Sequence, residues 1–253
     1  WHTLSLHDAL PICTPMKSAK HNQTLCYTKC LEIAQALKRL LQNKYFYISL
    51  AAVVGGKQLN NFSQTYLYNQ VQQGKTLLGL SDLILDNLPY WDIDYIYDIF
   101  MLVASVIFII YVVHKQHYNK IPYFLVLGGI YYLIRGIFII LTPLGNPPLF
   151  DGTSGLFNGF AKYELGVYPS GHTGIAFLYF LLAENKYYKI IFLICTFIII
   201  GAFFFARGHY SIDILSGIIF AYAIKAFGDK HVRDYFCGKD FEQKMKKRSI
   251  RQN

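Results

Sequence analysis

Long runs of apolar residues limit this chain to a narrow set of folds. Four runs are nearly free of charge and approach the length of a membrane helix: Tyr95–Val113, Ile121–Leu141, Tyr187–Phe205 and His209–Phe227. A helix needs about 20 apolar residues to cross the hydrocarbon core of a bilayer. Hydrophobic residues make up 54% of the 253 residues and charged residues only 15%, a balance typical of polytopic membrane proteins. The runs therefore predict an all-α membrane protein and argue against a soluble globule.

Two further segments are less regular. The apolar segment Gly171–Ala183 is shorter than a full crossing. The segment that begins at Tyr45 is apolar only as far as Gly55 and Gly56, and Lys57 follows. Length alone leaves open whether these two segments cross the membrane.

The placement of charge favours six crossings. Basic residues precede the first segment, separate the two central spans, precede the fifth span and fill the tail: Lys17, Lys20, Lys29, Lys38, Arg39, Lys44, Lys115, Lys120, Lys186, Lys189 and those from Lys225 to Arg251. They share one side of a membrane only if both irregular segments cross, and the positive-inside rule makes that side the cytoplasm. The opposite loops carry mainly acidic residues: Asp82, Asp86, Asp92, Asp94, Asp151 and Glu164. The net charge of +9 needs no nucleic-acid partner, because cytoplasmic flanks and anionic lipid account for it.

The chain divides by sequence into four parts. The stretch TLSLHDALPI at Thr3–Ile12 resembles the translation of a sequencing adapter, so we expect an assembly artefact there and a true start at Met16. The expected parts are the artefact at 1–15, a basic cytoplasmic segment at 16–44, a six-span membrane domain at 45–229 and a basic cytoplasmic tail at 230–253.

A polar cluster, ARGHYSIDIL at Ala206–Leu215, lies between the last two long runs. His209 and Asp213 are four residues apart, so on a helix they share one face and the carboxylate can hold the imidazole by its ring N–H. A histidine held in this way is a candidate nucleophile toward phosphorus, and the aspartate would stabilise the charge it acquires. The alternative is a structural His–Asp pair that helps helices pack.

A second polar cluster, PSGHT at Pro169–Thr173, opens the short fourth segment. Ser170 is placed to cap a helix, and the free backbone N–H groups that begin at Gly171 can bind phosphate oxygens. His172, when protonated, could donate a proton to a leaving alkoxide. By itself, a histidine at a membrane surface is more often structural than catalytic.

Two arginines could neutralise a phosphate in a transition state. Arg135 lies inside the apolar run YYLIRGIFIILTP, where a charge is costly in lipid and usually marks a site, and Arg207 precedes His209. The alternative role of Arg135 is to snorkel to the membrane surface. With six spans, Arg135, His172 and His209 all reach the extracytoplasmic surface, which is where we expect the site.

The ordered combination of these motifs resembles the sphingomyelin synthase family, within the type 2 phosphatidic acid phosphatase (lipid phosphate phosphatase) superfamily. SGHT at Ser170–Thr173 and HYSID at His209–Asp213 look like the two catalytic motifs of that family. LSDLILDNLPYWD at Leu80–Asp92 and YLIRGIFIILTPLGNPP at Tyr132–Pro148 fit the same order, and the similarity spans roughly Tyr45 to Asp229. The resemblance implies a six-transmembrane-helix bundle of the lipid phosphate phosphatase type.

The same resemblance implies roles for the residues. His209 would attack the phosphorus of a phospholipid head group with help from Asp213, and His172 would protonate the departing diacylglycerol. The phospho-histidine would then pass its head group, such as phosphocholine or phosphoethanolamine, to ceramide or a similar lipid alcohol. The chain also departs from related patterns. It has no Arg-Pro dipeptide, it carries Phe203 where plain phosphatases have an arginine, and it lacks the Cys-Gly-Asp element that commonly precedes SGHT in the synthases.

Three functions stay open at this point. The first is head-group transfer between lipids, and the second is hydrolysis of a lipid phosphate or diphosphate, with water as the acceptor. The third is a non-catalytic membrane protein that binds lipid. The missing phosphatase arginines favour transfer. We expect no metal or other cofactor, because histidines and arginines supply the charge, and we infer no obligatory protein partner besides the donor and acceptor lipids.

Overall fold

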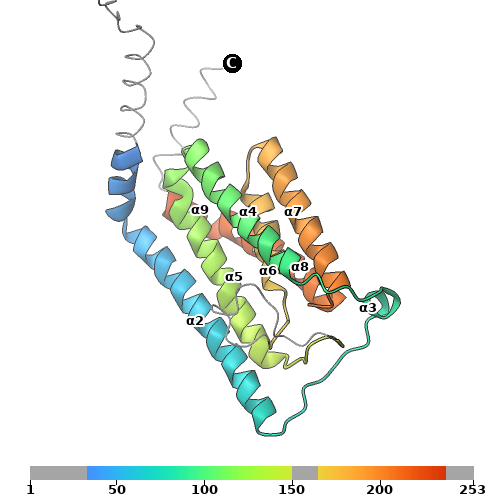
Figure 1. Ribbon diagram of the computed structural model, residues 1–253. Coiled ribbons are helices and arrows are strands. Elements are labelled where there is room, and N and C mark those ends of the chain that lie inside the picture. Colours follow the sequence, from blue (N-terminus) through green and yellow to red (C-terminus); the bar gives the residue numbers. More distant parts are fainter. Residues whose placement is uncertain (1–32, 150–164, 238–253) are drawn as a thin grey trace, which may run out of the picture. The chain divides into compact units, whose positions relative to one another are not determined.

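The computed structural model describes residues 33–149 and 165–237 (Figure 1). The sequence-based predictions for residues 1–15, for most of the basic segment at 16–44 and for the tail beyond Cys237 lie outside the described residues, as do Asp151 and Glu164. The chain forms two compact units, residues 1–42 and residues 43–253. All the elements below belong to the second unit.

Helices form nearly all of the regular structure in this unit. In chain order they are α2 (Lys44–Gln72), α3 (Leu83–Asn87), α4 (Tyr95–His114), the 3₁₀ turn η1 (Tyr118–Lys120), α5 (Ile121–Leu141), α6 (Gly171–Leu182), α7 (Lys186–Phe205), α8 (Ser211–His231) and α9 (Arg233–Cys237). Over the described ranges no strand is present, and the one isolated bridge joins Leu78 and Leu144. The predicted all-α class is confirmed.

The predicted bounds of the apolar helices agree with the structure to within one residue except in the last helix, which was predicted at His209–Phe227 and spans Ser211–His231. The predicted helix at Ile121–Leu141 has the observed bounds of α5, and α4 and α7 differ from their predictions by one residue. The last helix was expected to begin at His209 but begins at Ser211, because Asp213 accepts the N–H of Tyr210 and so caps the helix there. His209 therefore precedes α8 and is not part of it.

Four helical segments are long and apolar enough to cross a membrane: Tyr95–His114, Tyr118–Leu141, Lys186–Phe205 and Ser211–His231. They identify a multi-pass membrane protein. Helix α6 is apolar but has only 12 residues, which at the rise of an α-helix span about 18 Å. Helix α2 is long enough, with 29 residues, but polar side chains such as Lys57, Asn60 and Gln64 interrupt it. Six crossings therefore stay a prediction.

Small residues let α2 and α5 approach closely. A Cβ on Gly56 would lie 2.7 Å from the carbonyl oxygen of Gly129, and a Cβ on Gly129 would lie 2.6 Å from the backbone of Ala52. The Ser63 hydroxyl also donates to the carbonyl of Gly136 across this contact, at 2.7 Å. Such close packing of backbones is a common way for helices to associate in lipid.

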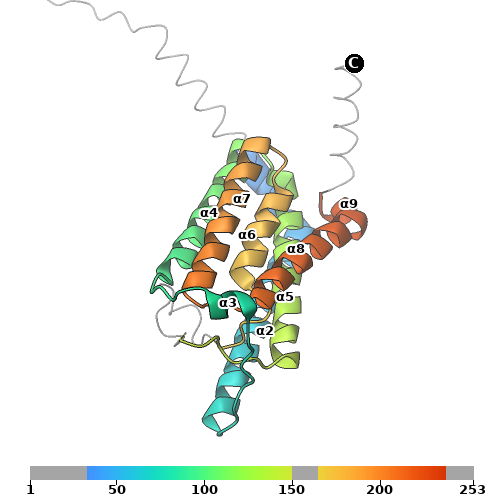
Figure 2. The same cartoon turned by 90° about the vertical axis from the view of Figure 1, so that its right-hand side faces the viewer.

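Helix α6 lies at the centre of the remaining helices, against α8, α7, α4 and α5 (Figure 2). Its buried side chains join a mainly aromatic and aliphatic core with Tyr111, Leu127 and Phe192. The short α6 is therefore enclosed by longer helices, and Ser170 and Thr173 at its start are fully buried. This arrangement sinks the PSGHT motif into the bundle.

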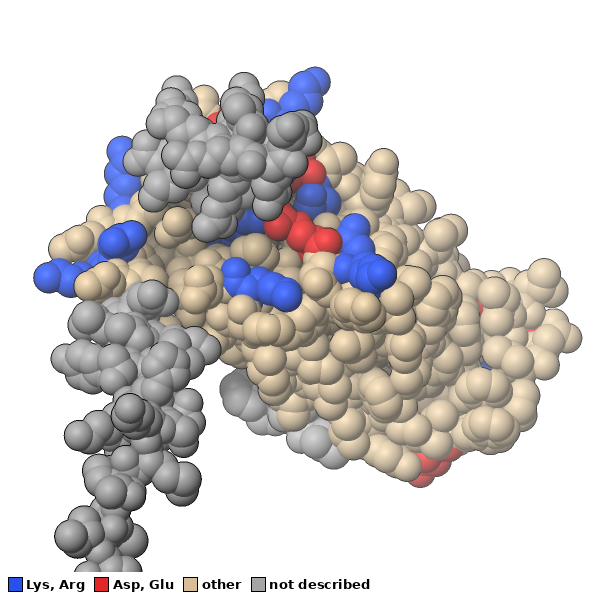
Figure 3. Space-filling view, turned by 90° about the horizontal axis from the view of Figure 1, so that it is seen from above, with Lys and Arg blue, Asp and Glu red and all other residues tan. Residues whose placement is uncertain are grey.

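The bundle has two ends of different chemistry. The site end is where α6 and α8 begin and α5 and α7 finish, and it carries Asp82, Asp94 and Asp98. The basic end is where α5 and α7 begin and α6 and α8 finish. Seen from that side, Lys and Arg side chains gather around an acidic group (Figure 3). The separation agrees with the expectation that basic flanks share one side.

Candidate active site

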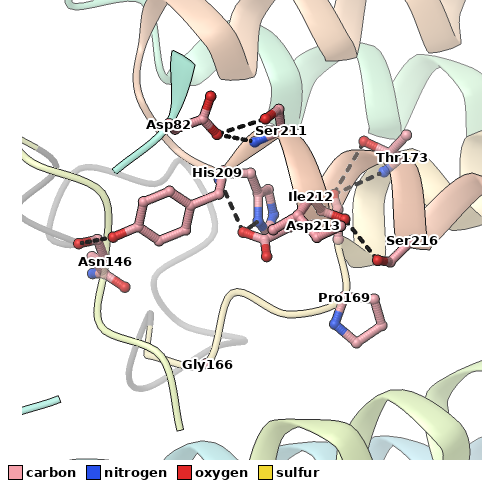
Figure 4. A network of polar contacts seen from close by, with 12 residues as sticks. Asp82, Asn146, Gly166, Pro169, Thr173, His209, Ser211, Ile212, Asp213 and Ser216 are labelled. Atoms are coloured by element: carbon pink, nitrogen blue, oxygen red, sulfur yellow. Dashed lines mark hydrogen bonds and ion pairs between the residues drawn. The ribbon is translucent and has the colours of Figure 1, made fainter. Parts of the chain in front are cut away.

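Backbone contacts bring the two histidine motifs together at the site end. The N–H of Ser170 donates to the carbonyl oxygen of Asp213 at 3.0 Å, and the Tyr131 hydroxyl donates to the carbonyl of Ser170 at 2.7 Å. Gly217 of α8 is required here, because a Cβ at that position would lie 2.8 Å from the Ser170 oxygen. The starts of α6 and α8 are thus held against each other (Figure 4).

His209 lies beside Asp213, as the sequence predicts. Nδ1 of His209 is 3.4 Å from Oδ2 of Asp213, which also accepts the N–H of Tyr210 at 2.9 Å. Asp213 has 0% exposure, and its Oδ1 meets no hydrogen-bond donor within the described ranges. The contact arises because His209 precedes the helix while the capping carboxylate turns back toward it. In the tautomer that donates Nδ1–H to Asp213, the lone pair of Nε2 can act as a nucleophile.

The environment of His209 favours its neutral form. Burial lowers the pKa of His209 below its ordinary 6.5, because a charged imidazolium is poorly solvated there. The hydrogen bond to Asp213 opposes this effect and nearby Arg135 and His172 add to it, so the net pKa shift is downward.

His172 has a carboxylate partner that the sequence analysis missed. Its Nε2 lies 3.1 Å from Oδ1 of Asp98, in the first turn of α4. The Asp98 side chain is only 8% exposed, whereas that of His172 is 37% exposed. The available signal was a carboxylate inside the apolar run YIYDIFMLV, since an ionisable group in a membrane helix usually has a partner. An imidazolium at His172 can pair with this carboxylate.

The ring of Phe203 connects the two histidines. Its centroid lies 4.4 Å from that of His209 and 5.7 Å from that of His172, with both pairs edge to face. On another side it stacks on Tyr97 at 4.4 Å. Phe203 and Tyr97 are buried, so the histidines share an apolar aromatic wall.

Arg135 is buried and does not snorkel to the surface. Its Nε donates to the carbonyl of Pro169 at 2.8 Å, Nη2 donates to that of Gly166 at 3.1 Å, and Nη1 donates to the Asn60 side chain. These bonds fix the loop that leads into Ser170 and connect it to α2. Asn60 is a further residue that the sequence analysis did not single out.

The guanidinium of Arg207 is bound by the backbone of α3 and its C-cap. The backbone of Arg207 has φ of 54°, and its Nη2 donates to the carbonyls of Leu85 and Leu88 at 3.1 and 3.2 Å. The structure therefore places this predicted phosphate ligand against α3 instead. Its nonhelical backbone also ends α7 and lets the chain turn toward His209.

Asp82 ties α3 to the start of α8. It caps α3 through the N–H groups of Ile84 and Leu85, and it accepts both the N–H and the hydroxyl of Ser211, at 2.6 and 2.7 Å (Figure 4). Burial by itself raises the pKa of this carboxyl, but the hydrogen bonds from Ser211 and the backbone outweigh it and lower the pKa. Asp82 thus caps α3 and holds it against the start of α8.

The start of α6 has the form of an anion site. Ser170 is the N-cap, and its hydroxyl accepts the N–H of Thr173 at 3.4 Å. The first-turn N–H groups of Gly171 and His172 have no partner within an α-helix. A Cβ on Gly171 would lie 3.2 Å from Nε of Arg135, so glycine permits this close approach of the arginine. Helix N-termini of this kind bind phosphate.

No protein-family model matches the chain, and no curated protein does either. Across residues 33–149 and 165–237, no group of three or more His, Cys, Asp or Glu side chains is arranged to hold a metal ion. The geometry of the histidines and their partners is therefore the basis for assigning a function.

Proposed function

We propose that this chain is a sphingomyelin synthase-like phosphotransferase, which moves a phospho-head group from a glycerophospholipid to ceramide or a similar lipid alcohol. The observation that carries the proposal is that two histidines, each beside a buried carboxylate, contact one aromatic ring. A phospho-enzyme mechanism needs a nucleophile and an acid close together, and two histidines in different environments meet that need.

In the first half of the reaction, Nε2 of His209 forms a bond to phosphorus, and the bond from phosphorus to the glycerol oxygen breaks. The leaving alkoxide takes a proton from His172, which becomes neutral. Asp213 balances the positive charge on His209. In the second half, His172 takes the proton of the acceptor hydroxyl, the acceptor oxygen bonds to phosphorus, and the bond to Nε2 breaks. Both histidines then regain their initial protonation.

The phosphate would bind at the start of α6. The N–H groups of Gly171 and His172 can donate to its oxygens. Arg135 uses three of its N–H donors on Pro169, Gly166 and Asn60 and retains others, so its guanidinium can position the loop and still contribute charge. In this proposal Arg207 does not bind the phosphate but holds α3 in place.

Hydrolysis by the same phospho-histidine is the second candidate. The aromatic wall of Phe203 and Tyr97 favours transfer, because apolar surface around the reacting groups disfavours bound water. A non-catalytic lipid-binding protein is the third candidate. It is disfavoured because Asp98 and Asp213 are buried carboxylates, which are costly to retain without a function.

Product analysis separates these three candidates. The chain is reconstituted in liposomes with a fluorescent ceramide and defined phospholipids, and the lipids are separated by chromatography. We expect a new fluorescent phospholipid together with diacylglycerol. If free phosphate or phosphocholine forms without that lipid, the function is hydrolysis and not transfer. If a folded chain forms no product, the lipid-binding function is the one that remains.

We further propose that six helices cross the membrane, with the site end extracytoplasmic and both termini cytoplasmic. The basic flanks of the helices support this orientation. A cysteine introduced by Asn87→Cys at the site end should react with an impermeant maleimide in intact cells, and one introduced by Lys186→Cys should react only after the membrane is opened. The chain without an added cysteine gives the background, and the opposite order of labelling would reverse the orientation.

A further inference from the structure

The basic end contains a pocket that the proposed reaction does not use. Its volume is about 340 Å³, and it is formed where six elements meet: η1, the start of α5, the end of α6, the start of α7, the end of α8 and α9. The lining residues that matter below are Lys120, Lys189, Lys225, Arg233, Glu184 and Asp229.

The charges of this pocket are mostly basic. Glu184 lies 2.5 Å from the ammonium of Lys120, and Asp229 pairs with Lys225 and lies 3.8 Å from Arg233. Lys189 pairs with no carboxylate over the described stretches of chain, and its ammonium lies 5.7 Å from the ring of Phe180. Four cations therefore face two carboxylates, which leaves an excess of positive charge.

The pocket is separate from the active site. Helices α6 and α8 both begin beside the histidines, and both reach the pocket only at their other ends. The 12 residues of α6 alone place about 18 Å between the two places. A ligand in the pocket cannot touch His172 or His209.

The ligand chemistry follows from the lining. Lysine ammonium and arginine guanidinium groups that converge from different helices suit a phosphate, whose oxygens accept several charge-assisted hydrogen bonds. The excess of positive charge fits a dianionic phosphate monoester better than a zwitterionic head group. An apolar wall of Phe124, Leu181 and Leu182 adjoins the charged side, and it suits the glycerol and acyl part of a lipid.

We propose that this pocket binds the phosphate of an anionic phospholipid whose head group is a phosphate monoester. In a membrane, the basic ends of these helices lie at one surface, where anionic lipid supplies the ligand. The phosphate displaces none of the ion pairs, because Lys189 provides the first contact and Arg233 retains N–H donors beyond its contact with Asp229.

The test measures binding to the purified full chain by native mass spectrometry, with dioctanoyl phosphatidic acid, dioctanoyl phosphatidylcholine and inorganic phosphate as separate probes. We expect saturable binding of phosphatidic acid. Lys189→Glu should weaken it about tenfold or more, since it removes a charge-assisted contact and adds a repulsion. Lys75→Glu, an exposed exchange at the site end, is the matched control and should leave binding unchanged.

A second variant keeps the test informative if the charge reversal disturbs the fold. Leu181→Trp fills the pocket without changing its charge, and it should weaken phosphatidic acid binding as well. Equal affinity in the original chain and in both variants would overturn the proposal. If inorganic phosphate binds as tightly as phosphatidic acid, the proposal that the phosphate belongs to a lipid is wrong. If phosphatidylcholine binds as tightly, the proposal that the head group is a phosphate monoester is wrong.

Discussion

The two ends of the bundle use acidic partners in different surroundings. At the site end, the carboxylates beside the histidines are buried, with side-chain exposures of 8% for Asp98 and 0% for Asp213. At the basic end, Glu184 and Asp229 are 52% and 38% exposed. Exposed ion pairs contribute about 0 to 1 kcal/mol, whereas loss of one partner of a buried pair leaves an uncompensated charge. Exchanges at the site end should therefore have much larger effects.

The largest effect should come from removing the proposed nucleophile. His209→Ala should lower the transfer rate by at least about 10⁴-fold, because no other group can form the covalent intermediate. The rate is measured in the liposome assay with fluorescent ceramide. Lys115→Gln, at the basic end and outside the pocket, should leave the rate unchanged. A His209→Ala chain that keeps a substantial part of its activity would remove the phospho-histidine from the mechanism.

The exchange Asp98→Asn should have the next largest effect. We expect a loss of roughly 10²-fold to 10³-fold, because His172 loses the carboxylate that pairs with its charged form. A second phosphocholine donor distinguishes this role of Asp98 from a purely structural one. With p-nitrophenyl phosphocholine, whose leaving group needs no proton, most of the loss should disappear from the first step, which is measured as the initial release of p-nitrophenol. If the loss is the same with both donors, Asp98 does not act through the acid.

The aromatic wall should control the fate of the phospho-histidine to a smaller degree. Phe203→Leu keeps an apolar side chain but removes the ring that contacts both histidines. We expect the ratio of hydrolysis to transfer to rise several-fold, since water gains access to the intermediate. Phosphocholine and the new phospholipid are measured in the same reaction. An unchanged ratio would show that the ring does not exclude water.

The smallest effect should be a shift along the pH axis. His209 must be neutral to attack, so activity is present above its pKa and is lost as the pH falls through it. Because burial lowers this pKa from 6.5, the acidic limb of kcat/KM should lie below pH 6.5. Asp213→Asn removes the contribution that raises the pKa, so its residual activity should show a limb at still lower pH. A limb above pH 6.5 would contradict the assignment of His209.

Local patterns in the sequence were sufficient to predict most of the helices. The run Ile121–Leu141 became α5 without change, and Ser170 capped α6 as expected, because apolar length and caps depend on neighbouring residues. The start of α8 was wrong by two residues, since a carboxylate inside the segment capped it. Because polar residues interrupt α2, hydropathy alone did not decide whether this helix crosses the membrane.

The pairing of His209 with Asp213 was predictable because the two residues are close in the sequence. The partners of His172 and Arg135 were not, because Asp98, Asn60 and Gly166 come from segments far away along the chain. Arg207 was expected to face the phosphate, but its left-handed backbone turns the side chain toward α3.

The sequence by itself therefore determined the helical class, most of the helix bounds and the two histidine motifs, since each depends on short-range chemistry. Only the tertiary structure decided which groups surround those histidines. The cost of burying a charge forces each ionisable side chain to find a partner, but helix packing selects that partner from segments that the sequence keeps apart. The same packing forms the pocket at the basic end, which no single sequence motif predicts.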